Sequence, residues 1–351
     1  MGLASRGGQA TGVHGPPIDT PDLRDYPSSM DVCSGFDRFA PPPEGVVLTI
    51  GNFDGVHRGH ARLIRTAHSV ADCLSVPMAV ITFHPHPLAI LAPERAPERL
   101  TTLAERLALL EHLGVGCCIV LRSEAEFLAQ RAEDFLASLV AHCRPRALVE
   151  GPDFNFGRGR EGSLDTLRSH AQQWDYEVHT VPAVHCSELS TDPIIKSSSI
   201  RQALQEGRVR EANAMLGRAY RITGRTGEGA RRGTGLGFPT ANLNDIVHLM
   251  PQQAVYAAVA QLDDETRYTA AVNIGPQPTF SQDVSRVEAH LLDFDGNLRG
   301  QRIGLHLLTR LRVQSRFHNS DELVTQLRQD VAATGDLAED PDSSRIECIP
   351  L

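Results

Sequence analysis

The stretch GNFDGVHRGH, residues 51–60, decides how the first half of this chain folds. An apolar run at residues 46–50 precedes it and predicts a buried strand, and the helical apolar spacing of residues 61–73 predicts a helix after it. Its glycines allow the backbone to turn sharply and to approach a ligand closely. The helix that follows points free amide groups back at the turn. A turn of this kind at the carboxyl end of a parallel strand is where doubly wound sheets bind nucleotides.

Two histidines of this turn, His57 and His60, are the first candidates for a chemical role. Their spacing puts both imidazoles on the same side of a first helical turn. A lone histidine at such a place is more simply explained as a helix cap or a surface residue. Two histidines in a glycine-framed turn after a buried strand favour contact with a ligand.

The rest of the first half alternates short apolar runs with helical patterns. Strands are expected at residues 78–83, 117–121, 147–149 and 176–181, and helices at residues 103–113, 124–143 and 164–173. This alternation is typical of the α/β class with a doubly wound parallel sheet and helices on both faces. Residues 1–43 are rich in Gly, Pro, Ser and Asp and predict a disordered N-terminal arm, so the first domain should span residues 44–205.

In the second half the pattern changes to closely spaced strands, separated by turn signals such as Asp295-Gly296-Asn297. Two short helices are expected at residues 200–206 and 209–216, and strands at residues 220–224, 255–262, 269–274, 286–292 and 303–311. Such strands, with few helices between them, predict a small antiparallel β-barrel. Residues 321–331 predict a closing helix, so the second domain should span residues 206–340.

The composition restricts the partners of this chain of 351 residues. A formal net charge of −9 lacks the basic excess of nucleic-acid-binding domains, so we expect no nucleic-acid partner. No apolar run approaches the roughly 18–20 residues of a membrane span, so we expect no membrane partner. Seven cysteines without a CxxC pair predict free thiols in a reducing cytoplasm. We expect small-molecule substrates and a monomer or weak homo-oligomer.

Four stretches of the first half together resemble the bacterial bifunctional riboflavin kinase/FAD synthetase family. GNFDGVHRGH is similar to the family's first motif, and its HxGH marks the nucleotidyltransferases to which the adenylyltransferase half belongs. TFHPHP at residues 82–87, GPDFNFG at 151–157 and KSSSIR at 196–201 resemble the second-strand motif, the GxDFxFG loop and the SSTxIR segment. His84 stands where the family usually has Glu, and Lys196 replaces the first serine.

This resemblance implies that the first domain joins FMN to ATP, forming FAD and releasing pyrophosphate. Because the FMN phosphate is already an anion, the reaction needs positive charge and hydrogen-bond donors around the phosphates rather than a general base. His57 and His60 would supply these at the α- and β-phosphates, as catalytic and ATP-binding residues. The other ATP-binding residues that the motifs imply are Gly51, Asn52, Phe53, Asp153, Ser197, Ser198 and Arg201.

In the second half, GRTGEGARRGTGLG at residues 224–237 combines glycines with arginines, which suits a phosphate-binding loop. In isolation, the alternative is a flexible linker, which is the less favoured of the two interpretations. FPTANL at 238–243 resembles the LGFPTANL motif of riboflavin kinases, and residues 271–280 and 287–294 resemble their VNIGxxPTF and VExHLLDF motifs. Thr240 and Asn242 offer hard oxygen ligands that suit Mg²⁺. The implied ATP-binding residues are Gly229, Gly233, Gly237, Thr240 and Asn242.

Glu288 is the candidate proton acceptor of the second domain. A riboflavin kinase transfers the γ-phosphoryl group of ATP to a neutral ribityl hydroxyl, which must lose a proton to a nearby base. Strand alternation would place Glu288 and His290 on one face, and Ala289 and Leu291 on the other. The alternative is a surface glutamate on an edge strand. Three positions depart from the family pattern: Thr234, Ala254 and Arg299.

The resemblance therefore implies an enzyme that uses ATP and Mg²⁺ to phosphorylate riboflavin in its C-terminal domain and to adenylylate FMN in its N-terminal domain. Two alternatives stay open. A monofunctional riboflavin kinase with an inactive first half is disfavoured by the intact HxGH. A non-catalytic flavin or nucleotide sensor is disfavoured by Glu288, His57 and His60, because binding alone needs none of them.

Overall fold

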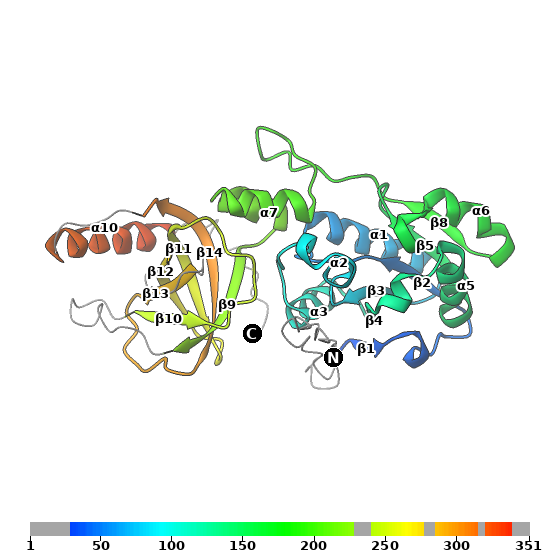
Figure 1. The fold of residues 1–351 in the computed structure, drawn as a ribbon, viewed down its shortest axis with the longest axis horizontal. Helices are drawn as coiled ribbons and strands as arrows, with labels where there is room; N and C mark the ends of the chain where they lie inside the picture. Colours follow the sequence, from blue (N-terminus) through cyan, green and yellow to red (C-terminus); the bar gives the residue numbers. More distant parts are fainter. Residues whose placement is uncertain (1–28, 228–239, 277–284, 315–319, 339–351) are drawn as a thin grey trace, which may run out of the picture.

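The computed structural model describes residues 29–227, 240–276, 285–314 and 320–338. The first half forms a layered α/β body and the second half forms a barrel, and the two lie side by side (Figure 1). Helix α7 (Ser197–Gln205) lies at their junction, and α8 (Val209–Leu216) follows it and leads into the barrel.

The α/β body is built on a six-stranded sheet in which neighbouring strands are parallel. The spatial order is β1-β4-β3-β2-β5-β8. The strands are β1 Asp31–Ser34, β2 Val46–Ile50, β3 Met78–His84, β4 Cys117–Arg122, β5 Pro145–Glu150 and β8 Glu177–Thr180. The chain order reverses at β2, since β3 and β4 lie on one side of it and β5 and β8 on the other. The predicted doubly wound sheet is confirmed.

Helices cover both faces of this sheet, as the sequence pattern predicts (Figure 1). Along β2, Val47 packs into the apolar cluster beneath α1 and α3, and Leu48 packs into the cluster beneath α5 and α6. The helices are α1 Arg58–Leu74, α2 Pro87–Leu91, α3 Leu103–His112, α4 Ala125–Leu128, α5 Ala132–Cys143 and α6 Leu164–Trp174. A small hairpin, β6 (Asn155–Phe156) with β7 (Gly162–Ser163), lies between β5 and α6 in the chain.

The expectation of a disordered arm over residues 1–43 is wrong for its last part. Strand β1 pairs with β4 at the edge of the sheet, and the Phe36 ring lies 6.2 Å from that of Phe135, centroid to centroid. Because this four-residue strand has no buried side chain, backbone pairing holds it rather than an apolar pattern that sequence reading could detect. Residues 1–28 lie outside the described residues.

The single helix expected over residues 124–143 is also wrong, because α4 and α5 are separate. The Gln130 carbonyl accepts a hydrogen bond from the Arg158 backbone N–H at 2.8 Å. The next residue, Arg131, is extended, with φ −64° and ψ 155°. A tertiary hydrogen bond thus interrupts a stretch whose apolar spacing alone indicates one continuous helix.

The second body is a closed barrel of antiparallel strands in the order β10-β13-β12-β11-β14-β9, which confirms the predicted antiparallel barrel. The strands are β9 Tyr220–Gly227, β10 Ala241–Asn244, β11 Ala254–Leu262, β12 Arg267–Pro276, β13 Ser285–Leu291 and β14 Arg302–Arg312. Strand β10 is not among the expected strands, because its sequence ANLN has low β propensity. The closing helix α10 (Ser320–Ala338) extends beyond the expected residue 331, and its Asp330 pairs with Arg312 at 2.7 Å.

Helices α7 and α8 share the apolar core of the barrel. Ile200 and Leu204 of α7 are fully buried in the same cluster as Tyr256 of β11. The Leu204 carbonyl also accepts a hydrogen bond from the Gln252 backbone N–H at 3.0 Å. The domain boundary at residues 205 and 206 stays a prediction, and a cut there would divide this cluster.

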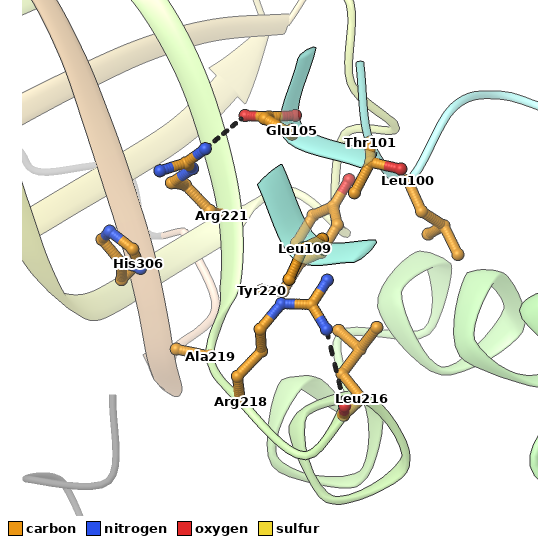
Figure 2. A pocket seen from close by; sticks show the side chains of 10 residues that line it. All are labelled: Leu100, Thr101, Glu105, Leu109, Leu216, Arg218, Ala219, Tyr220, Arg221 and His306. Carbon is orange, nitrogen blue, oxygen red and sulfur yellow. Dashed lines mark hydrogen bonds and ion pairs between the residues drawn. The ribbon is translucent and has the colours of Figure 1, made fainter. Parts of the chain in front are cut away.

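A buried carboxylate joins the two bodies. Glu105 of α3 accepts hydrogen bonds from Arg221 Nη2 at 3.1 Å and Thr223 Oγ1 at 3.0 Å, and lies 2.7 Å from His248 Nε2. Figure 2 shows the Glu105–Arg221 pair beside the segment that enters the barrel. Burial alone would raise the pKa of Glu105, but His248 and Arg221 outweigh it and hold that pKa well below its usual range. A charged carboxylate therefore fixes the barrel against α3.

Candidate active sites

A cleft of about 450 Å³ opens at the carboxyl edge of the sheet, beside β2 and β5. This is the point where the strand order reverses, the usual place of a ligand in a doubly wound sheet. The HxGH turn forms one wall, the loop that follows β5 forms a second, and residues 181–184 and 194–197 complete the lining. Three of the four motifs of the first half, those at residues 51–60, 151–157 and 196–201, therefore contribute to one cavity, and no residue of 82–87 is among those that line it.

His57 and His60 form a reciprocal cap on α1. His57 Nδ1 accepts the His60 backbone N–H at 3.3 Å, and His60 Nδ1 accepts the His57 backbone N–H at 3.4 Å. Their rings stack at 3.6 Å between centroids with 13° between planes. Since each Nδ1 is an acceptor, the proton of each neutral ring lies on Nε2. Both residues line the cleft, so it is bordered by two N–H donors.

Both imidazoles are neutral near physiological pH. Burial, with the charge of Arg218 next in size, lowers the pKa of His57 to about 3. Burial, with His57 next in size, lowers the pKa of His60 well below its usual range. The pair therefore supplies hydrogen-bond donors rather than the positive charge that the sequence also allowed.

Gly51, Asn52 and Phe53 are the first residues of the turn that follows β2. A Cβ added at Gly51 would lie 3.2 Å from the Phe53 ring, so a side chain at this position would have to displace that ring slightly. Phe53 is buried and packs against His60 at 5.0 Å between centroids, so it supports the histidine. Asn52 Oδ1 is buried without a hydrogen-bond partner, but Asn52 is not among the residues that line the cleft.

The start of α7 brings a cation and a hydroxyl to the opposite wall. Lys196 Nζ lies 2.8 Å from Asp153 of the loop after β5, and this contact lowers the pKa of the Asp153 carboxyl. Ser197 Oγ donates to the Asp54 carbonyl at 2.9 Å and borders the cleft. Ser198 is exposed. The structure thus brings Lys196, Asp153 and Ser197 together with the HxGH turn.

Arg201 points elsewhere, to a carboxylate that sequence reasoning missed. Its guanidinium pairs with Asp54 and donates through Nε to the Glu98 carbonyl at 2.7 Å. Asp54 is buried and also accepts the backbone N–H groups of Leu100 and Thr101. Its place in GNFDG was the only sequence signal. Arg201 is not among the residues that line the cleft, although its charge acts on His57, so its role at the phosphates stays a prediction.

Glu150 is a second residue that sequence reasoning missed. It ends β5, is buried, and accepts the Ile50 backbone N–H at 2.7 Å at the bottom of the cleft. Burial raises the pKa of Glu150 well above its usual range, although the Ile50 N–H opposes the effect. The Glu150 carboxyl lies where the pairing between β2 and β5 ends. The only sequence signal for this residue was a single acid after an apolar run.

A second polar group lies on the outer surface of the barrel. Glu288 of β13 stands directly opposite Asn242 of β10 and Asn273 of β12. Val287 and Ala289 belong to the barrel core, so Glu288 faces outward, as alternation predicts. Glu288 is half-buried and lies 3.4 Å from its neighbour on the same face, Arg286. Three adjacent strands therefore place two amides beside the candidate base.

Asn242 fits a metal ligand. Its Oδ1 is buried and has no hydrogen-bond partner, whereas Thr240, just before β10, is exposed. No group of three or more His, Cys, Asp or Glu side chains that could hold a metal occurs among the described residues. The expected magnesium site thus depends on the Thr and Asn oxygens. Gly229, Gly233, Gly237 and Thr234 lie outside the described residues.

The other two departures from the family pattern have simple structural settings. Ala254 begins β11 and is fully buried in the barrel core, where its small side chain fits. Arg299 is exposed in a turn, where its backbone N–H donates to Asn297 Oδ1 at 3.0 Å.

In the part of the chain that the structure describes, no helix combines the length and apolar character that crossing a membrane requires.

Fold and sites together define a two-domain transferase, in which an HxGH-type nucleotidyltransferase domain is joined to an antiparallel barrel. Two family models match the chain, one described as FAD synthetase over residues 40–193 and one described as riboflavin kinase over residues 216–338. The chain belongs to the bifunctional riboflavin kinase/FMN adenylyltransferase family.

Curated relatives agree over most of the chain. The bifunctional riboflavin kinase/FMN adenylyltransferase of Escherichia coli strain K12 is 36% identical over 290 residues, which cover 82% of this chain and 91% of that protein. The protein of the same name from Bacillus subtilis strain 168 is 32% identical and covers 81% of this chain and 90% of its own. A Streptococcus pneumoniae crystal structure, described as a macrolide-efflux protein, has a TM-score of 0.78 and 28% identity. It covers 88% of this chain and 99% of its own, so the two share the whole arrangement.

Proposed function

We propose that the chain carries out two successive reactions at its two sites. At the barrel, riboflavin and ATP give FMN and ADP. In the cleft of the sheet, FMN and a second ATP give FAD and pyrophosphate. The observation that carries the second assignment is the stacked, reciprocally capped histidine pair with two Nε2–H donors on the cleft.

In adenylyl transfer, an oxygen of the FMN phosphate forms a bond to the α-phosphorus of ATP while the bond from that phosphorus to the pyrophosphate oxygen breaks. Charge accumulates on phosphate oxygens in the transition state, and preorganised donors stabilise it. We assign His57 and His60 to the α- and β-phosphates. We assign Lys196 and Ser197, which line the opposite wall, to the departing pyrophosphate. The pairing of Lys196 with Asp153 then exchanges for pairing with phosphate.

In riboflavin phosphorylation, the ribityl hydroxyl oxygen forms a bond to the γ-phosphorus while the bond to ADP breaks. We assign Glu288 to accept the hydroxyl proton. Asn242 and Thr240 would hold Mg²⁺, which reduces the negative charge of the triphosphate when bound. The unpartnered Asn242 Oδ1 beside Glu288 supports this assignment.

Separating the flavins formed from riboflavin, ATP and Mg²⁺ by the purified full chain tests this function. We expect FMN to appear first and FAD to follow. Accumulation of FMN without FAD would instead identify a monofunctional kinase. Binding of flavin or nucleotide without turnover would identify a sensor, and either result would overturn the proposal.

We also propose a cytoplasmic location and a monomeric or weakly associating state. The location is supported by the six described cysteines, all of which are free thiols. Light scattering across a concentration series measures the oligomeric state, and a stable higher oligomer would contradict the proposal.

A further inference from the structure

The backbone that leads into His57 adopts conformations that side chains disfavour. Phe53, Gly55 and Val56 have φ values of 48°, 84° and 36°. Only glycine adopts this region without strain, so the surroundings must hold Phe53 and Val56 in place. The position of His57, and with it the stacked pair, depends on whatever fixes this turn.

Arg218, which lies far away in the sequence, fixes it. Its Nη2 donates to the Gly55 carbonyl at 2.6 Å and its Nη1 to the Val56 carbonyl at 3.1 Å. Figure 2 shows the Arg218 side chain extending from the segment that enters β9, with a further bond to Leu216. A planar guanidinium can hold two successive carbonyls at once, which a lysine ammonium cannot do with the same rigidity.

A second arginine, from the start of α1, also connects the HxGH turn to the segment at the end of α8. Arg58, the first residue of α1, donates to the Ala214 carbonyl of α8 at 3.1 Å and pairs with Glu188. A Cβ added at Gly217 would lie 3.1 Å from Arg58 Cγ, so the two segments are in close contact. Arg218 and Arg58, one from each segment, thus hold the HxGH turn against the end of α8.

Arg218 is also one of the charges that surround His57. Arg218 and Arg201 oppose protonation of this ring, and Asp54 favours it, while the neighbouring ring of His60 is neutral. A proton on His57 Nδ1 would remove the acceptor for the His60 backbone N–H. The reciprocal cap therefore requires His57 to be neutral, and the charge of Arg218 supports that state.

We propose that Arg218 is a positioning residue for adenylyl transfer: from within the segment that matches the riboflavin kinase model, it fixes the turn that carries His57 and His60. This inference rests on the proposed role of these two histidines. It predicts that the sheet-domain reaction depends on a side chain from the other half of the chain.

The test uses the full chain with Arg218→Met or Arg218→Lys, and Arg208→Ala as a matched control. Arg208, between α7 and α8, pairs with Glu206 and Glu211. Both Arg218 variants should lower kcat for FMN adenylylation by about 10–100-fold, because small displacements of catalytic groups have effects of this size. KM for ATP should change less, and riboflavin phosphorylation should match the wild type.

The pH profile distinguishes the two contributions of Arg218. Arg218→Met removes the charge, so the acid limb of the adenylylation rate should move to higher pH. Arg218→Lys keeps the charge, so its acid limb should stay at the wild-type position although kcat falls. Arg208→Ala should alter neither reaction.

Unchanged adenylylation in both Arg218 variants would overturn the inference. So would an equal loss of both reactions with no shift of the acid limb, since that is the result of general destabilisation. His57→Ala, assayed in parallel, tests the proposed function separately: if it leaves adenylylation intact, the histidine assignment itself fails.

Discussion

His57 and His60 each use one ring nitrogen to cap a helix and have the other available for a ligand. From the sequence, a cap and a ligand contact were alternatives for these residues. In the structure they are compatible, because capping by Nδ1 fixes the proton on Nε2 at the cleft. The residue spacing therefore predicted the shared face, but the tautomer and the neutral state required the three-dimensional contacts.

Replacing both histidines with alanine should slow FMN adenylylation and leave riboflavin phosphorylation unchanged. Losing one preorganised donor to developing charge costs about 10²–10³-fold in rate, so the double variant should show at least this loss. Steady-state FAD formation from supplied FMN measures it. His68→Ala, on the same helix, is the control and should retain activity. A double variant with the wild-type rate would contradict the assignment.

Asp54 and Glu150 mark the limit of prediction from single residues. Asp54 holds Arg201 and two backbone amides, and Glu150 caps the end of β2. Both are acids in or beside motifs, but nothing in their spacing indicates these contacts. Arg201 was expected at the phosphates because its segment resembles a phosphate-binding motif. Its contact with Asp54 depends on residues far apart in the chain, which pattern reading does not detect.

At the level of helices and strands, the sequence predicts elements that carry a strong apolar period and misses those held by backbone contacts. Strands β2, β3 and β4 were found because both of their faces are buried. Strand β1 and the break before α5 were missed, since each depends on hydrogen bonds to distant backbone groups. Strand β10 was missed because its sequence ANLN has low β propensity.

Leu204→Ala in α7 should destabilise the barrel by about 2–5 kcal/mol, the usual cost of a cavity at a fully buried leucine. The barrel is affected because Leu204 packs into the cluster that contains Tyr256. Urea denaturation, together with heat inactivation of riboflavin phosphorylation, measures the effect. Leu91→Ala, at an exposed position of α2, should change stability very little. A loss below about 1 kcal/mol for Leu204→Ala would contradict the shared core.

Considered as a whole, the molecule is held together by polar contacts that the two halves of the sequence do not reveal separately. Glu105 joins α3 to Arg221, Thr223 and His248, and Arg218 joins the barrel entrance to the HxGH turn. The two-domain composition was predictable from the change of pattern near residue 205. The contacts between the bodies were not, because each partner has no local pattern that indicates the other.

Stability should fall in mild acid, in part because His306 is buried. Burial, with the charge of Arg221 next in size, lowers the pKa of His306 to about 3, below the value of about 6.5 expected in the unfolded chain. The unfolded state therefore binds more protons between these values. The contribution of His306 is complete above pH 6.5 or so and is lost progressively as the pH falls to about 3.

Urea denaturation of the wild type and of His306→Gln, from about pH 7 to about pH 5, measures this contribution. Glu150, whose pKa is raised, has the opposite dependence, but it is present in both proteins and cancels in the comparison. The variant should lose stability less steeply, by up to about 1.4 kcal/mol per pH unit. Equal slopes for the two proteins would contradict the neutral state of His306.

The central claim is that each reaction has its own site in one chain. The most direct measurement follows all flavins formed from riboflavin, ATP and Mg²⁺ by Glu288→Gln, by the His57→Ala/His60→Ala double variant, and by an equal mixture of the two. We expect Glu288→Gln to slow FMN formation by about 10²–10⁴-fold while still converting supplied FMN to FAD. The double variant should accumulate FMN, and the mixture should produce FAD from riboflavin. If Glu288→Gln slows both steps equally, or if the mixture fails to make FAD, the two-site account is wrong.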